Sequence, residues 1–169
     1  MSVDTPWQGK FIEVRRDGRW EYVARTGNVR AAVVLALDGE HVVLVEQLRV
    51  PLGRRCLELP AGLIDVGENA VEAAGRELVE ETGYRAASLE ELGEFCSSPG
   101  MVSEIFTLVR ASGLERVGGG GGIDGEDIVV HRVAIDGIAG FVADRRAAGV
   151  AIDVKLLLLL AAGYLKLSA

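Results

Sequence analysis

Three glutamates at helical spacing are the residues of this chain best suited to catalytic chemistry. Glu77, Glu80 and Glu81 stand at positions i, i+3 and i+4, which places their carboxylates on one face of adjacent turns if the segment is helical. Carboxylates this close repel one another unless a cation holds them, and hard divalent cations take oxygen ligands of this kind. Acidic runs on helices are most often solvated faces, so the glutamates alone leave both interpretations open.

The flanking residues predict that the glutamates do lie on a helix. Asn69 can cap its first turn, and Glu72, three residues later, completes a capping-box pattern. Gly83 supplies a residue that can leave the helix in the left-handed conformation. Arg76 stands four residues before Glu80 and can pair with its carboxylate. A tight, glycine-containing loop precedes the helix and favours a metal site, because it can bring backbone carbonyls toward the helix start.

The wider pattern resembles the Nudix box, which reads G-x5-E-x7-R-E-U-x-E-E-x-G-U, with U apolar or aromatic. Every specified position is matched, by Gly62, Glu68, Arg76, Glu77, Leu78, Glu80, Glu81, Gly83 and Tyr84. Nine positions at fixed spacing make a specific motif. The chain is therefore similar to Nudix hydrolases. The resemblance implies pyrophosphate hydrolysis on an α/β/α sandwich with a mixed β-sheet, and it names no substrate.

The same resemblance implies roles for the residues of the box. Glu77 and Glu81 would hold Mg²⁺, with Mn²⁺ as an alternative, and the Ala61 carbonyl would be a backbone ligand. Glu80 would assist, and Arg76 would orient the glutamates. Divalent metals in such a site neutralise the phosphates, orient them and lower the pKa of a bound water.

An N-terminal β-hairpin is expected at residues 10–25, because alternating segments flank Asp17-Gly18. Trp20 and Tyr22 share one face of this hairpin, where they could be hairpin packing or a dimer contact. In the ADP-ribose pyrophosphatase subgroup, which the chain resembles, such a segment crosses to a second subunit and an aromatic residue stacks on the nucleobase. Trp20 is the candidate for that role, with Tyr22 as the second choice.

Two later segments carry further candidates for substrate binding. Arg49 follows an expected strand in an EQxR segment. An arginine there binds the substrate's phosphates in relatives, although a lone arginine is most often a surface ion-pair partner. The sequence around Pro99 is similar to the same subgroup, although Pro-Gly makes turns anywhere. In that loop Met101 is a candidate substrate contact, and Glu104 is a candidate carboxylate beside the metals.

A run of five glycines at residues 118–122 precedes an acidic segment. By itself the run indicates a flexible connection, and the functional alternative is a mobile loop that brings a carboxylate over the metals when substrate binds. In relatives, an acidic cluster precedes a strand that resembles residues 128–133, and one of its acids activates water or completes the metal shell. Glu126 is the first choice as base or last metal ligand, and Asp124 is the alternative.

Composition narrows the class of protein. A chain of 169 residues suits one domain with a sizeable core, and 49% apolar residues exclude a disordered chain. The net charge of −7 without a basic run argues against nucleic-acid and membrane partners. Leu156 to Leu160 is too short a run to span a bilayer, and the N-terminus lacks the apolar core of a signal peptide, so a cytoplasmic location is expected. Cys56 and Cys96 are expected as buried thiols.

We divide the chain into an N-terminal hairpin segment, residues 1–28, exchanged in a homodimer, and a Nudix hydrolase domain, residues 29–169. Two late helices, capped by Asp136 and Asp153, are expected to close the second part. The expected function is Mg²⁺-dependent hydrolysis of a nucleoside diphosphate sugar, with ADP-ribose giving AMP and ribose 5-phosphate as the first choice. GDP-mannose or another nucleotide sugar is the alternative substrate. A non-catalytic Nudix module that binds ADP-ribose-like ligands is the alternative of another class.

Overall fold

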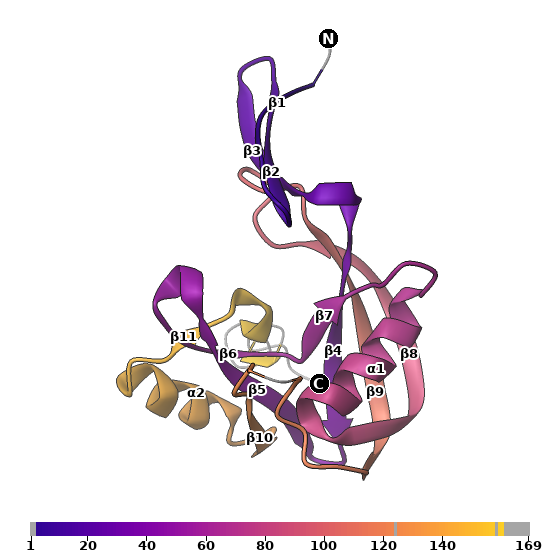
Figure 1. Ribbon diagram of the computed structural model, residues 1–169. Coiled ribbons are helices and arrows are strands. Elements are labelled where there is room, and N and C mark those ends of the chain that lie inside the picture. The colour runs from indigo at the N-terminus through magenta and orange to yellow at the C-terminus, as the bar shows by residue number, and fades with distance from the viewer. Residues whose placement is uncertain (1–2, 124, 158, 161–169) are drawn as a thin grey trace, which may run out of the picture.

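Two sheets of unequal size organise the protein. The structure is a computed structural model that describes residues 3–123, 125–157 and 159–160 (Figure 1). Within these residues the smaller sheet is antiparallel, with strand order β1-β2-β3. The larger sheet is mixed, with order β11-β6-β5-β4-β9-β8, and β10 pairs with β5 while β7 pairs with β4. The elements are β1 (Asp4–Gln8), β2 (Ile12–Asp17), β3 (Trp20–Arg25), η1 (Thr26–Asn28), β4 (Ala31–Asp38), β5 (His41–Arg49), η2 (Val50–Leu52), β6 (Arg54–Glu58), β7 (Ala61–Leu63), α1 (Ala70–Thr82), β8 (Tyr84–Cys96), β9 (Ile105–Arg116), β10 (Val129–Ala134), α2 (Ile138–Ala147), β11 (Ala151–Ile152) and η3 (Val154–Leu156).

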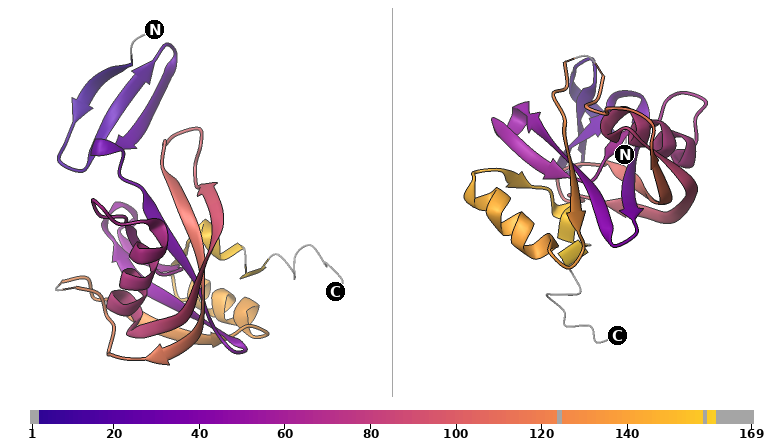
Figure 2. Two further views of the ribbon diagram at one scale, coloured as in Figure 1. Left: turned by 90° about the vertical axis from the view of Figure 1, so that its right-hand side faces the viewer. Right: turned by 90° about the horizontal axis from the view of Figure 1, so that it is seen from below.

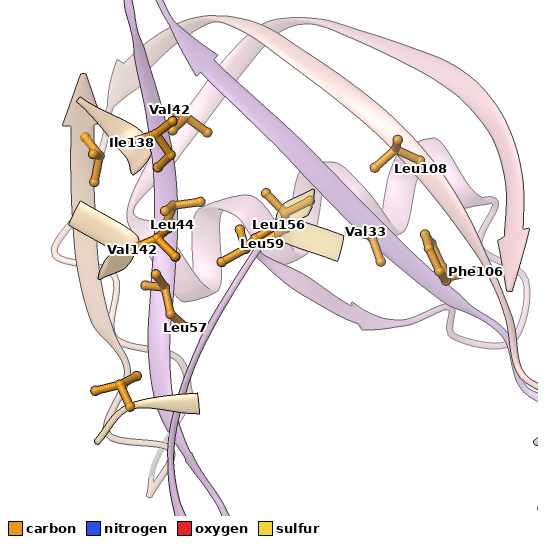
Figure 3. Packing of buried hydrophobic residues seen from close by; sticks show 12 residues of the cluster. Val33, Val42, Leu44, Leu57, Leu59, Phe106, Leu108, Ile138, Val142 and Leu156 are labelled. Atoms are coloured by element: carbon orange, nitrogen blue, oxygen red, sulfur yellow. The ribbon is translucent and has the colours of Figure 1, made fainter. Parts of the chain in front are cut away.

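Alternating side chains of β4 divide the core into two layers. Val33 belongs to a cluster that includes Ile138 and Val142 of α2 (Figure 3). Ala32 and Val34 belong to a second cluster that includes buried residues of α1. Successive residues of a strand point to opposite faces of a sheet, so α1 and α2 cover opposite faces. The expected α/β/α sandwich with a mixed sheet is confirmed, and the apolar run of β4 reflects burial on both faces.

The larger sheet opens at β4, and this opening positions the box. The last residues of β4, Ala36 to Asp38, pair with β5 next to their shared turn. The first residues, Ala31 to Val33, pair with β7 instead. β7 therefore enters the sheet beside β4 and leads through a short loop directly into α1. The first glycine of the box lies in β7, against the helix that carries the glutamates.

The N-terminal sheet stands apart from the rest of the chain and meets the connection between β8 and β9 (Figures 1 and 2). The expected hairpin is confirmed as β2 and β3, but Asp17 pairs with Trp20, so its turn residues are Gly18-Arg19. Gly18 has a φ of 58°, as such a two-residue turn requires. β1 is a third strand that alternation alone did not reveal. Val23 donates its N–H to the Met101 carbonyl (2.9 Å), which joins the small sheet to the β8–β9 connection.

Three expectations from the sequence need correction or lie outside the described residues. Cys56 is buried as expected, but Cys96 is exposed because it ends the edge strand β8. Asp136 does not cap α2, whose N-cap is Gly137 without a side-chain hydrogen bond. Asp153 does cap the turn η3, but most of the expected last helix lies outside the described residues. No helix among the described residues is long and apolar enough to cross a membrane.

Candidate metal and active site

The box helix α1 has the start and stop that its sequence predicts. The Asn69 side chain accepts from the N–H groups of residues 71 and 72, and the Glu72 carboxylate accepts from the Asn69 N–H (2.9 Å), so both halves of the capping box are present. Gly83 ends the helix at a φ of 73° and donates its N–H to the Val79 carbonyl (2.9 Å). Both ends of α1 are thus fixed by local interactions, and the box glutamates lie on its last two turns.

Glu77 lies against the backbone of β7. A Cβ at Gly62 would overlap the Glu77 carboxylate, so only glycine allows the strand and this side chain to approach so closely. The carboxylate accepts a hydrogen bond from Arg76 Nη1 (2.7 Å). Burial raises the pKa of Glu77, and the charges of Glu80 and Glu126 raise it further, while Arg76 opposes them.

Glu81 is the most buried carboxylate of the box, with 5% of its surface exposed. Its Oε2 accepts a hydrogen bond from the Ala61 N–H (3.0 Å). Burial raises the pKa of Glu81 to about 8, with repulsion from Glu77 and Glu126 adding to the increase, while the Ala61 N–H and Arg49 oppose it. A buried carboxylate with so little compensation is a strong candidate for a cation ligand.

Arg76 ties the loop before the helix to the helix itself. Its Nε and Nη2 donate to the two oxygens of Glu68 (3.0 and 2.9 Å), and Nη2 also donates to the Leu63 carbonyl (2.9 Å). Its Nη1 reaches Glu77 and, at 3.3 Å, Glu80. The hydrogen bonds from Arg76 lower the pKa of Glu68. Glu68 was not assigned a role from the sequence, although its place in the box was the signal that it has one.

The glycine run forms the cap of α1, and this differs from the flexible connection that its composition indicates (Figure 1). Gly121 and Gly122 donate their N–H groups to the carbonyls of Glu81 (2.8 Å) and Glu80 (3.0 Å). The Gly118 N–H donates to the Gly83 carbonyl (3.1 Å). The last carbonyls of a helix lack partners within the helix, so the run satisfies them and fastens the loop to the turn that carries the glutamates.

This fastening brings Glu126 beside the box. Glu126 Oε2 accepts a hydrogen bond from the Ile123 N–H (3.0 Å), which closes the loop on itself. The negative charge of Glu126 raises the pKa of both Glu77 and Glu81, so the three carboxylates share one electrostatic environment. The alternative candidate, Asp124, lies outside the described residues.

The donor set of this cluster suits a divalent cation, but the carboxylates do not yet converge on a common point. Within the described parts of the chain, no three carboxylate, imidazole or thiolate groups form a ready metal cage. Each carboxylate accepts a hydrogen bond from a different protein group. The donor to Glu77 is the Arg76 guanidinium, the donor to Glu81 is the Ala61 N–H, and the donor to Glu126 is the Ile123 N–H. The mutual repulsion of these three carboxylates, and the burial of Glu77 and Glu81, are the conditions that a bound cation relieves. Binding therefore requires rotation of side chains whose backbones are already in place.

Arg49 lies close enough to Glu81 to lower its pKa and is itself held by a buried acid. Its Nε and Nη2 donate to the two oxygens of Glu58 (2.6 and 2.7 Å). Glu58 is 4% exposed, whereas the Arg49 side chain is 41% exposed. A fork of this kind fixes the plane of the guanidinium. Glu58 was not identified from the sequence, because only the folded arrangement of β5 and β6 brings its carboxylate against the Arg49 guanidinium.

The remaining candidates gather where the N-terminal sheet meets the β8–β9 connection. A cavity of about 370 Å³ is lined there by Asp17, Trp20, Tyr22, Pro99, Gly100, Val102 and Ser103. Met101 is exposed beside it. Glu104 forms an ion pair with Arg25 (2.7 Å), so its assignment beside the metals stays a prediction. The structure thus brings Trp20 and the proline loop together within one chain.

The chain belongs to the Nudix family, because the model of the NUDIX domain matches residues 27–129. It is 36% identical over 118 residues to a methanol dehydrogenase activator of Bacillus methanolicus, covering 69% of this chain and 64% of that protein. It is 41% identical over 128 residues to an ADP-ribose pyrophosphatase of Mycobacterium tuberculosis, covering 70% of this chain and 61% of that protein. The crystal structure of an ADP compounds hydrolase superposes with a TM-score of 0.72 at 26% identity, covering 98% of this chain and 92% of that chain. The chain thus spans less than two thirds of the length of these curated relatives.

Proposed function

We propose that the protein is a divalent-metal-dependent hydrolase that cleaves the pyrophosphate bond of a nucleoside diphosphate sugar. ADP-ribose, which with one water gives AMP and ribose 5-phosphate, is the proposed substrate. The observation that carries the proposal is a complete Nudix box whose last helical turn is hydrogen-bonded to the loop that bears Glu126. Likeness to an ADP-ribose pyrophosphatase and to an ADP compounds hydrolase supports the choice of substrate.

The metal ligands would be Glu77, Glu81 and Glu126, with the Ala61 carbonyl as a backbone ligand, and the proposed ion is Mg²⁺. A divalent cation bound there would supply positive charge to the diphosphate and acidity to water. Arg76 keeps the carboxylates on α1 oriented through its contacts with the helix and with the preceding loop. The net charge of −7 would otherwise repel an anionic substrate.

Proton transfer would fall to a carboxylate at the edge of this cluster. Glu126 can take a proton from the attacking water at its carboxylate, because the loop that carries it is fastened to the end of α1 that bears Glu80 and Glu81. Glu80 is more exposed, with 37% of its side chain accessible, and it is linked to Arg76. We therefore assign Glu80 an assisting role and Glu126 the role of base or last metal ligand.

Arg49 would bind the diphosphate without losing its own support. Within the described residues its hydrogen bonds use Nε and Nη2, which leaves the Nη1 edge of the guanidinium for a phosphate oxygen. A guanidinium already fixed by a carboxylate loses little conformational entropy when it binds a second anion. This arrangement favours a diphosphate ligand over a neutral one.

The nucleobase would occupy the cavity at Trp20. Its volume of about 370 Å³ and its aromatic lining suit a planar ring stacked on the indole. Trp7 and Trp20 of the small N-terminal sheet and Phe11 in the β1–β2 connection are all exposed, and the sheet has little core of its own. We propose that a second copy of the chain covers this sheet and that the homodimer completes the substrate pocket. Met101, beside the cavity, would contact the bound nucleotide.

The test is release of nucleoside monophosphate from ADP-ribose, GDP-mannose, UDP-glucose and a nucleoside triphosphate, each with Mg²⁺ and with a chelator. Wild type is compared with Glu81→Gln and with Glu115→Gln, which alters an exposed carboxylate on β9. Metal-dependent turnover of ADP-ribose that is lost in Glu81→Gln and kept in Glu115→Gln is the expected result. Preference for GDP-mannose would contradict ADP-ribose as the substrate but would support metal-dependent pyrophosphate hydrolysis. Binding of ADP-ribose without turnover of any compound would refute the proposal in favour of a binding module.

A further inference from the structure

The segment that carries Glu126 is fastened on a second side, away from the glycine run. Arg55 of β6 donates from Nη1 to the Asp127 carboxylate (3.0 Å) and from Nη2 to the Asp127 carbonyl (2.9 Å). Asp127 directly follows Glu126. One guanidinium therefore grips both the side chain and the backbone of the residue next to the proposed base.

Arg55 is itself held rigidly from inside the sheet. Its Nε donates to a Glu46 carboxylate oxygen (3.0 Å) and its Nη2 donates to the Glu46 carbonyl (2.7 Å). Glu46 is 2% exposed and also receives Arg145 Nη2 (2.7 Å), with His131 Nε2 at 3.2 Å. A buried carboxylate surrounded by such partners costs much to disturb. The guanidinium plane of Arg55 is thus set by the core and not by the loop that it holds.

The hydrogen bonds from Arg55 stabilise an unusual backbone conformation at Asp127. Asp127 has a φ of 49°, in the left-handed region that non-glycine residues rarely adopt. Two hydrogen bonds from Arg55 hold that conformation, and the direction of the Glu126 side chain depends on it. Release of Asp127 would let the chain leave the left-handed region and turn Glu126 away from the box.

We infer that Arg55 is a positioning residue, anchored by Glu46, that holds Glu126 against Glu77 and Glu81 through Asp127. The inference rests on the proposed function for its catalytic consequence, but the grip itself is a property of the free protein. It predicts a preformed acidic loop fastened at both ends, in place of a segment that closes only over substrate.

Arg55→Met removes the guanidinium that makes these hydrogen bonds while keeping an unbranched aliphatic stem. Asp127→Asn is the second variant, because asparagine tolerates a positive φ and keeps the carbonyl acceptor but loses the charge. It leaves the pairs of Glu46 intact, so it separates the grip from any loss of core stability. Arg132→Met is the matched control, since Arg132 of β10 also holds an aspartate, Asp38 at 2.5 Å, away from the box.

The first readout is amide hydrogen exchange of the metal-free protein, which needs no activity. The N–H groups of Gly121, Gly122 and Ile123 are hydrogen-bonded and are expected to be protected in wild type and in Arg132→Met. In Arg55→Met they should exchange at least about tenfold faster, with α1 unchanged and Asp127→Asn in between. Unchanged exchange at these amides would overturn the inference, as would equal acceleration throughout the chain.

The second readout is steady-state turnover of ADP-ribose. A shift of about 1 Å in a catalytic group costs up to ~10²-fold, so kcat of Arg55→Met should fall at least about tenfold with KM nearly constant. A kcat equal to that of wild type would refute the positioning role, whether or not KM changes. If wild type hydrolyses none of the substrates, the proposed function fails and the exchange comparison alone decides whether the grip exists.

Discussion

Glu81 makes the free protein less stable at alkaline pH, and its removal tests the electrostatics of the whole site. The carboxyl titrates near 4.5 when unperturbed, and burial raises its pKa to about 8 in the folded protein. Between these values the folded chain binds more protons than the unfolded chain. The contribution of Glu81 to stability is therefore fully present below pH 4.5 and is lost as pH rises toward 8. Glu81→Gln keeps the size of the side chain and an acceptor for the Ala61 N–H but removes the charge.

The size of the effect follows from the two pKa values. The free-energy penalty of ionisation at pH 8 is roughly 4 kcal/mol, and at pH 5 it is below about 1 kcal/mol. For a domain of this length 1 kcal/mol corresponds to about 2–4 °C in Tm. Without metal, Glu81→Gln should therefore melt roughly 10 °C above wild type at pH 8 and nearly with it at pH 5. A catalytically dead variant that is more stable than its parent is the signature of a strained functional site.

Thermal unfolding in chelator, followed by circular dichroism at pH 5, 6, 7 and 8, measures this difference. The Tm of each variant is compared with that of wild type at the same pH, which cancels the titration of all other groups. Glu115→Gln, exposed on β9, should track wild type. Added Mg²⁺ should stabilise wild type more at pH 8 than at pH 5 and should leave Glu81→Gln nearly unaffected. If the variant is no more stable than wild type at pH 8, the burial argument for Glu81 is wrong.

Three substitutions test the close backbone approaches and the helix cap that position the site. Gly120→Ala places a Cβ against the backbone at the end of α1, at a φ of 67°, and should cost about 2–4 kcal/mol in urea unfolding, whereas Gly119→Ala points into open space and should change little. Gly62→Ala displaces the Glu77 carboxylate and should lower kcat at least about tenfold, and an active Gly62→Ala enzyme would show that Glu77 is not needed where it lies. Asn69→Ala removes the cap of α1 and should cost about 1 kcal/mol in urea unfolding with kcat unchanged, so a loss of kcat would assign the cap a further role.

The box helix could be predicted from the sequence because every signal there is local. The Asn69 cap, the Gly83 stop and the pairing of Arg76 with Glu80 all act within a few residues along the chain. The layered fold was also accessible, since the apolar run of β4 and the alternation in β2 and β3 reflect burial directly. Local rules therefore fixed which side chains share a face of α1.

The partners of those side chains depend on tertiary structure, and the sequence did not reveal them. Five consecutive glycines indicate flexibility by composition, yet Gly121 and Gly122 donate to the last carbonyls of α1, and Gly120 lies so close to the α1 backbone that a Cβ would overlap it. The pairing of Arg55 with Asp127 joins residues 72 positions apart. Asp136 failed as a helix cap although its residue type suits the role, because α2 begins one residue later than the pattern predicts. Contacts between residues so far apart in the sequence form only when the strands of the larger sheet pair.

The distribution of arginines explains why the cluster of Glu77, Glu81 and Glu126 is suited to a cation. Two buried carboxylates of the sheet receive fork-like guanidinium contacts, Glu46 from Arg55 and Glu58 from Arg49. Glu81 is equally buried, yet its only hydrogen bond within the described residues comes from a backbone N–H. The fold thus gives the acids that support the site a guanidinium partner, whereas Glu81 receives no guanidinium hydrogen bond within the described residues. A divalent cation binds carboxylate oxygens and carries the positive charge that would offset the negative charge of these glutamates.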